Sequence, residues 1–183
     1  MKIIPTLLAF LPLIVASASA DEDTRRIEKE ILQDILRNTT ITVKPIDNPS
    51  VAKCFACTFY EARIRTREGD TSTTRETTCA MTPGGVKHVQ FPGSSSEIKE
   101  LPALLLPSFR LKKGADGETM LAALQAIYGE QFVDRDFDMR ISRKGSTWSF
   151  VTGKFFKKFS GVVMKTDATG RITSIKRSLS IVE

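Results

Sequence analysis

The three cysteines and the single histidine are the residues of this chain whose types and spacing suggest chemistry. Cys54 and Cys57 lie three positions apart, Cys79 follows after twenty-one intervening residues, and His88 comes nine positions later. Thiols and an imidazole at these positions permit three interpretations: one disulfide with a spare thiol, a redox couple, or a zinc site. The choice among them depends on the elements that carry these residues.

The disulfide interpretation follows from a predicted hairpin. Residues 51–67 and 71–82 are rich in residues typical of strands, and Glu68-Gly69-Asp70 between them forms the turn. A register in which the numbers of paired residues sum to about 136 places Cys57 opposite Cys79. The sequence therefore predicts a disulfide between Cys57 and Cys79.

Such a bridge between Cys57 and Cys79 contributes about 2–4 kcal/mol, mainly because it restricts the unfolded chain. Cys54 is then left without a partner inside the chain. An unpaired cysteine in an exported protein is either buried as a small apolar side chain or paired between two chains. A dimer through Cys54 is therefore one expectation.

The redox and zinc interpretations fit the sequence less well. A redox couple of Cys54 and Cys57 needs a thiolate stabilised at a helix N-terminus, whereas the aromatic and threonine residues around the pair favour a strand. A Cys3His set of Cys54, Cys57, Cys79 and His88 suits tetrahedral zinc, but the gap before His88 exceeds the usual ligand spacing. The sequence therefore predicts no metal and no cofactor.

Other catalytic constellations are sparse. With one histidine, His88, catalysis of the serine–histidine or cysteine–histidine kind has a single candidate base, and no nucleophile elbow, phosphate loop or two-histidine metal helix is found. Asp134, Asp136 and Asp138 alternate, so on a strand they share one face and could form an acid–base or calcium site. A solvated strand face flanked by Arg135 and Arg140 is the favoured explanation, and the sequence favours a protein without catalytic activity.

The first twenty residues indicate export. Lys2 precedes an almost wholly apolar run from Ile3 to Val15, and Ala18-Ser19-Ala20 matches the small-residue rule before a cleavage site. The run is too short to span a bilayer, and no later run is long enough. We therefore predict a signal peptide over residues 1–20, a periplasmic or extracellular protein, and no transmembrane segment.

Two helices and several strands are expected to position these residues. Ile27, Ile31 and Ile35 recur every four positions and predict a helix over residues 23–37. A second helix is capped by Asp116 and has a buried stripe that ends near Gly129; its members are Met120, Leu124 and Ile127.

Four strand-like runs follow this second helix and end the chain. The runs are residues 137–142, 147–152, 159–166 and 171–182, with turns expected at Gly145, at Gly153 and over residues 167–170.

This order of elements predicts an α+β fold in which antiparallel β-sheet packs against two helices. Residues 21–183 are expected to form a single α+β domain; the alternative is two helix-plus-sheet halves, about 21–110 and 111–183. The C-terminal half, a helix followed by four antiparallel strands, resembles a cystatin-like unit. That resemblance implies a four-stranded meander behind one helix.

Basic residues concentrate in the C-terminal half. Residues 101–183 contain 14 basic and 8 acidic residues, and between Met139 and Arg177 ten basic residues face a single acid, Asp167. Alternation in the last run predicts that its basic and serine side chains share the outer face of the sheet. The candidate ligand-binding residues are Arg140, Lys144, Trp148, Lys154, Lys157, Lys158, Lys165 and Lys176.

Basic groups beside aromatic rings suit an anionic partner with apolar or stackable parts. For an exported protein these observations predict a non-catalytic binding protein for an anionic lipid, a glycan or an acidic protein, and they disfavour nucleic acid. Alternatively, Trp148 and the phenylalanines fill the core and the lysines solvate the strand edges. Two other functions stay open: an inhibitor or accessory protein that docks through residues 101–109 or through exposed strand edges, and an exported hydrolase that uses the aspartates.

Overall fold

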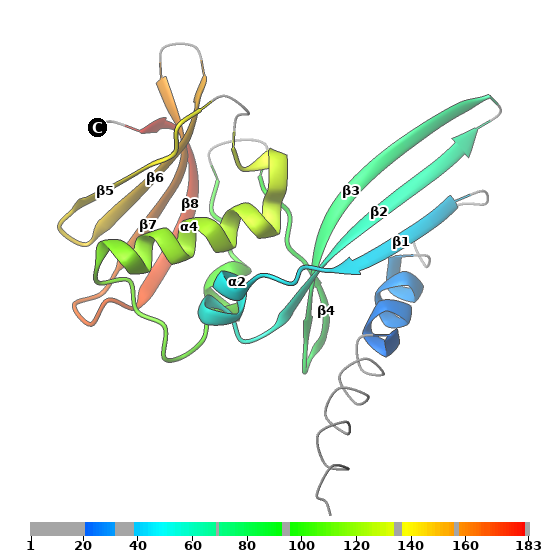
Figure 1. Cartoon of the computed structure of the whole chain (residues 1–183), viewed down its shortest axis with the longest axis horizontal. Coiled ribbons are helices and arrows are strands. Elements are labelled where there is room, and N and C mark those ends of the chain that lie inside the picture. Colours follow the sequence, from blue (N-terminus) through cyan, green and yellow to red (C-terminus); the bar gives the residue numbers. More distant parts are fainter. Residues whose placement is uncertain are drawn as a thin grey trace, which may run out of the picture.

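A computed structural model describes residues 21–31, 39–68, 70–92, 96–133, 137–155 and 158–181. Two four-stranded antiparallel sheets lie toward opposite ends of the long axis of the molecule, with helices between and beside them (Figure 1). The predicted α+β class is confirmed. The predicted signal peptide falls outside the described residues, and no helix in the described ranges has the length and apolar character needed to cross a membrane.

The first sheet has the strand order β1-β2-β3-β4. Its strands are β1 (Thr39–Pro45), β2 (Thr58–Glu68), β3 (Thr71–Thr82) and β4 (Gly85–His88). Each strand pairs antiparallel with the next one in the chain. The β2–β3 and β3–β4 connections are hairpins, whereas residues 46–57 connect β1 to β2.

A short helix, α2 (Pro49–Cys54), replaces the first part of the strand predicted over residues 51–67. The Asn48 side-chain oxygen accepts a hydrogen bond from the Ser50 amide at 2.8 Å, and Pro49 occupies the first helical turn. Both features stabilise a helix start. The predicted strand was therefore wrong before Thr58 and correct after it.

The second sheet has the order β5-β6-β7-β8. It follows a one-turn helix α3 (Leu101–Leu104), the long helix α4 (Gly114–Tyr128) and the 3-10 turn η1 (Gly129–Gln131). Its strands are β5 (Arg140–Lys144), β6 (Thr147–Phe155), β7 (Lys158–Thr166) and β8 (Ile172–Ile181). The predicted arrangement of a helix followed by a four-stranded meander is confirmed.

Two of the three predicted breaks in this meander are turns, at Gly145 and over residues 167–170. Gly153 is not a turn, because it lies inside β6 where the register with β7 shifts. A bulge of this kind bends a strand without ending it.

The main hydrophobic core lies between α4 and the second sheet and continues to α2, α3 and the base of the first sheet. The predicted stripe of α4 is buried, with Met120 and Leu124 0% exposed and Ile127 3% exposed. α2 packs against α4. This core therefore draws side chains from both halves of the chain.

A second, smaller core lies beneath the first sheet. The helical residues 21–31 place Ile27 and Ile31 against side chains of β1, β2 and β3, and the Tyr60 hydroxyl donates a hydrogen bond to the Asp23 carboxylate at 2.9 Å. Part of the predicted first helix, residues 32–37, lies outside the described residues.

Candidate functional site

All three cysteines are free thiols, and the predicted disulfide between Cys57 and Cys79 was wrong. The β2–β3 pairing closes with Glu68 opposite Thr71, so that Tyr60 rather than Cys57 lies opposite Cys79. This register differs from the expected one by three positions. Since an odd shift moves a side chain to the other face of a strand, Cys79 faces the second core while Cys57 contacts the main core.

The environment of the thiols keeps them protonated. Burial raises the pKa of Cys54 to about 12, aided by the Asp116 carboxylate. Burial raises the pKa of Cys57 to about 11 and, together with Glu30, that of Cys79 to about 11. Cys54 is the last residue of α2, at the end of the helix that disfavours a thiolate. The arrangement does not suit redox chemistry, which needs a lowered thiol pKa.

The residues of the zinc interpretation are divided between the two cores. His88 on β4 lies opposite Cys79 on β3, with 3.7 Å between Nδ1 and Sγ, while Cys54 and Cys57 belong to the main core. Nowhere in the described ranges do three histidine, cysteine or acidic side chains gather as metal ligands would. Cys54 itself is 0% exposed, so a disulfide between chains at this residue requires the core to open.

The aspartates of the hydrolase interpretation are only partly described. Asp134 and Asp136 lie outside the described residues, and Asp138 is exposed just before β5. A catalytic acid must be positioned within hydrogen-bond reach of a second group. Asp138 is exposed, and no described contact positions it in this way.

The face of the second sheet that points away from α4, here called the outer face, carries several of the predicted basic residues. One row across the strands contains Lys144, Thr147, Lys165 and Ser174, which are paired from β5 to β8. Lys144 and Lys165 are exposed. The lysines of this row therefore lie among hydroxyl groups on an open sheet surface.

The neighbouring row brings Lys176 to the same face. Lys176 pairs with Val163 of β7, Val163 pairs with Ser149 of β6, and Ser149 pairs with Ser142 of β5. Lys176 is exposed, as is Ser142. The predicted alternation of β8, with Lys176 outside and Ile175 inside, matches the observed burial.

A third group on this face consists of the Arg140 guanidinium and two phenylalanine rings. The Arg140 guanidinium lies 5.5 Å from the Phe137 ring centroid and 4.7 Å from that of Phe159. Both rings are half-buried, and Val151, opposite Arg140, is 1% exposed. Apolar surface therefore lies beside the positive charge at this end of the outer face.

The remaining predicted ligand-binding residues are Lys154, Lys157 and Lys158. Lys154 is exposed on β6. Lys157 lies outside the described residues, and of Lys158 only the backbone, as the first residue of β7, is described.

Trp148 does not belong to the outer face. Its side chain is 3% exposed and lies in the main core, where its ring edge contacts Gly117 of α4. The Arg143 guanidinium lies 5.0 Å from the Trp148 ring centroid and donates to the Lys112 carbonyl oxygen. Trp148 therefore joins helix to sheet, as the core-filling alternative predicted.

One acidic residue reaches the outer face from a distant part of the chain. Glu97 lies beside Lys176, because residues 96–98 run antiparallel along the edge of β8. The Ile98 amide donates to the Ile175 carbonyl oxygen, and the Arg177 amide donates to that of Ser96. Charge counting along the sequence missed this neighbour.

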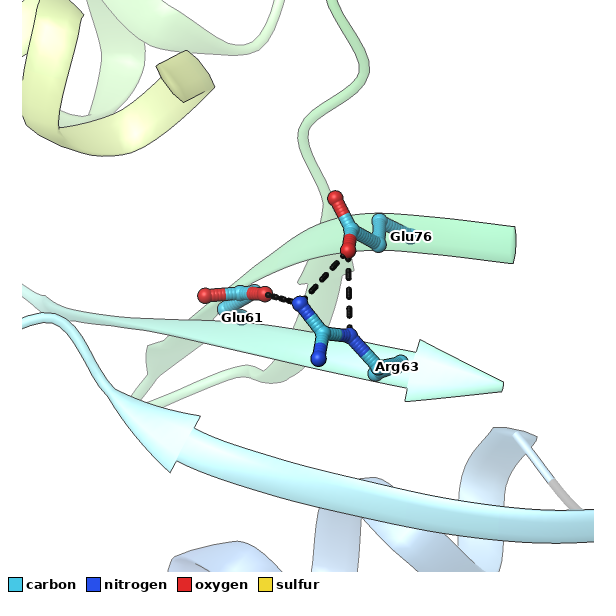
Figure 2. Close-up of polar contacts among 3 residues, drawn as sticks. All are labelled: Glu61, Arg63 and Glu76. Carbon is cyan, nitrogen blue, oxygen red and sulfur yellow. Dashed lines mark hydrogen bonds and ion pairs between the residues drawn. The ribbon is translucent and has the colours of Figure 1, made fainter. Parts of the chain in front are cut away.

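A cleft of about 440 Å³ lies between the first sheet and the end of α4. Ile127 and Tyr128 form an apolar wall, and Glu61, Arg63 and Glu76 form the opposite one. Figure 2 shows the Arg63 guanidinium between the two carboxylates. Arg63 approaches the Glu76 carboxylate at 2.7 and 3.0 Å and the Glu61 carboxylate at 3.5 Å.

The cleft does not show a catalytic arrangement. Arg63 neutralises part of the charge of Glu61 and Glu76, and all three side chains are about half exposed. Such surface pairs position side chains but contribute little stability. The alternation Arg63-Ile64-Arg65 in the sequence was the signal that these charges share a face.

The segment 101–109, expected as a docking surface, is anchored in the core at two residues, since Leu101 is 0% and Leu104 is 5% exposed. Leu105 forms a bridge to Phe55, and the Leu106 amide donates to the Cys54 carbonyl oxygen at 2.9 Å. These contacts join the segment to α2, while the rest of it is half-buried or exposed.

Comparison of the chain with protein-family models, with curated proteins and with solved structures found no match.

Proposed function

We propose that this protein is an exported, non-catalytic binding protein whose outer face takes an anionic ligand. The observation that carries the proposal is the open outer face, where Lys144, Lys165 and Lys176 lie among serine and threonine hydroxyls. Ammonium groups attract phosphate, sulfate or carboxylate, and hydroxyls donate further hydrogen bonds to the same oxygens. Glu97 lies beside Lys176 on this face, and the exposed Asp167 follows Lys165 by two residues.

The Phe137–Arg140–Phe159 cluster favours a ligand with apolar parts beside its charge. Anionic lipid headgroups and uronic or sulfated glycans share the anionic chemistry, and the lipid surface adds acyl chains that half-buried rings can contact. We therefore expect binding to a lipid surface that carries phosphatidylglycerol, with the glycan as the other source of the same charge.

The experiment measures cosedimentation of the mature protein with phosphatidylglycerol vesicles and, in a parallel arm, retention on a sulfated-glycan matrix. Lys165→Ser combined with Lys176→Ser is expected to weaken binding by an order of magnitude or more, because each basic residue contributes about 1 kcal/mol at an anionic surface. Lys87→Ser on β4 is the matched control, since it removes one exposed charge from the other sheet.

Binding should also fall between about 0.1 M and about 1 M salt, because ions screen exposed charges. Equal binding by the double variant and wild type, or no salt dependence, would contradict the proposal. Retention by the glycan alone would assign the ligand to that source.

A further inference from the structure

Glu97 lies directly beside a lysine of the outer face. The bridge between Glu97 and Lys176 is flanked by two main-chain hydrogen bonds between residues 96–98 and β8, which are 2.8 and 2.9 Å long. Bonds that flank a bridge in this way define a non-hydrogen-bonded antiparallel pair, in which the two side chains come closest. Since paired residues also share a face, Glu97 projects outward next to Lys176.

The segment that carries Glu97 is anchored to the rest of the protein. Ile98 is 1% exposed and belongs to the main core. The Arg177 guanidinium donates to the Pro92 carbonyl oxygen and lies 4.7 Å from the Phe91 ring centroid. The backbone position of Glu97 beside β8 is therefore part of the fold and does not depend on a ligand.

The Glu97 charge is not engaged elsewhere in the described part of the chain. Neither Glu97 nor Lys176 belongs to an ion pair among the described residues, and both side chains are exposed. The Asp167 carboxylate, by contrast, accepts hydrogen bonds from the amides of Thr169 and Arg171 at 2.8 and 3.0 Å, within its own turn. Glu97 is therefore the acid placed to act on an anion that approaches Lys176.

The lysines themselves are spread across the outer face. Lys144 and Lys165 belong to one row, but β6 lies between their strands, so that their backbones are about 10 Å apart. Lys176 lies on the next strand, two residues beyond the partner of Lys165. This spacing suits several anionic groups of one surface, each near its own lysine, better than a single small anion.

We propose that Glu97 is a built-in counter-charge that makes the outer face selective for dense anionic surfaces. The inference rests on the proposed function and concerns its specificity. An anionic group that approaches Lys176 also approaches the Glu97 carboxylate, well within the Debye length of about 10 Å at 0.1 M salt. The repulsion cancels part of the attraction at this lysine.

The selectivity follows from the number of lysines that a surface can engage at once. A surface with few anionic lipids engages one lysine at a time and is bound weakly, because the repulsion from Glu97 opposes it. A dense surface engages Lys144, Lys165 and Lys176 together, and their summed attraction exceeds the repulsion from one carboxylate.

The probe is a series of vesicles in which phosphatidylglycerol replaces phosphatidylcholine in steps. Glu97→Gln removes the charge and keeps the size of the side chain. At the phosphatidylglycerol content that binds half of the wild-type protein in about 0.1 M salt, Glu97→Gln is expected to bind about two- to fivefold more tightly, as for an exposed charge interaction. Half-binding should accordingly require less phosphatidylglycerol than it does for wild type.

Two further variants separate a local effect from a change of net charge. Glu118→Gln removes one exposed carboxylate from α4, which covers the opposite side of the second sheet, and is the matched control. In a Lys176→Ser background, Glu97→Gln should raise the affinity less than it does in wild type, because coupled neighbours are not additive. Equal denaturation midpoints in urea would show that the variants keep the fold.

The results distinguish this inference from the proposed function. Equal binding by Glu97→Gln and wild type, an equal gain in Glu118→Gln, or a gain undiminished by Lys176→Ser would overturn the inference. Weaker binding by the Lys165→Ser and Lys176→Ser double variant would still support the proposed function in each of these cases. Absence of wild-type binding at every phosphatidylglycerol content would contradict the lipid surface as ligand and this inference with it.

Discussion

The three free thiols should resist alkylation in the native protein. The perturbation is treatment with iodoacetamide at about pH 8, where the thiolate is the reacting form. With the reference thiol pKa of 9.0, roughly a tenth of the molecules of an exposed cysteine are ionised at that pH. With the pKa of Cys57 raised to about 11, the thiolate fraction and the rate fall about 100-fold. Cys54, with a pKa of about 12, should react about tenfold more slowly again.

The assay uses the same chain in denaturant as its internal reference. Time points are quenched, digested and mapped by mass spectrometry, so that each cysteine gives its own rate. Cys57 should react before Cys54 and Cys79, because only its side chain is partly exposed while theirs are buried. Cys57→Ser should remove the first-reacting site and leave the other two rates unchanged.

Two results would refute this reasoning. Native Cys57 reacting at the rate of the denatured chain would show that burial does not raise its pKa. An intact mass lower by two hydrogens than that of the reduced chain, with the difference disappearing on reduction, would show a disulfide. The structure shows all three cysteines as free thiols.

The raised thiol pKa values also have a consequence for stability. Since the unfolded thiols ionise first, stability present below about pH 9 is lost as the pH rises through about 11.

Three further variants test the fold. Gly161→Ala should lower the free energy of unfolding by about 1–3 kcal/mol, because an added Cβ would lie 1.9 Å from the Phe150 carbonyl oxygen; a denaturation midpoint equal to wild type in urea would argue against this close approach. Tyr60→Phe should cost about 1 kcal/mol by losing the bond to Asp23, measured in the same way, and an unchanged midpoint would show that the helix does not depend on it. Arg63→Met should change thermal stability by less than about 1 kcal/mol, since its ion pairs are exposed; a larger loss would mean that the cleft wall is structural.

Local signals in the sequence were sufficient for α4 and for most strands. The stripe of Met120, Leu124 and Ile127 and the terminal Gly129 predicted α4, and β3 was predicted with its observed bounds. α2 was missed because six residues are too few to show a helical period, although Asn48-Pro49 is a helix-start signal. The periodicity of apolar residues therefore identified the long helices and strands, whereas the short helix α2 could be recognised only from its N-terminal capping residues.

The disulfide prediction failed at the register rather than at the topology. The hairpin, its turn region and the pairing of β2 with β3 were predicted correctly, but an error of three positions moved Cys57 away from Cys79. Because side chains alternate between faces, an odd error exchanges one core for the other. The apolar alternation of Tyr60, Ala62 and Ile64 was the available check, since all three face the second core together with Cys79.

Charge could be placed from the sequence where residues of one sign dominate a run of strands. In the strands β5–β8 basic residues dominate, so their lysines were assigned to the outer face, but the acid Glu97, which comes from outside these strands, was missed. In the first sheet a net charge near zero concealed a row of arginines. Arg63, Arg65 and Arg67 alternate along β2 and hence share the face of the cleft.

Glu61 and Glu76 are both paired with Arg63, whereas the Arg65 guanidinium bonds only the Ser72 hydroxyl among the contacts described for it. Toward the tip of the hairpin, Arg65 and Arg67 line one hollow together with Asp70. Acidic side chains therefore accompany the arginines both at the cleft and toward the tip, so that opposite charges lie close together along this face.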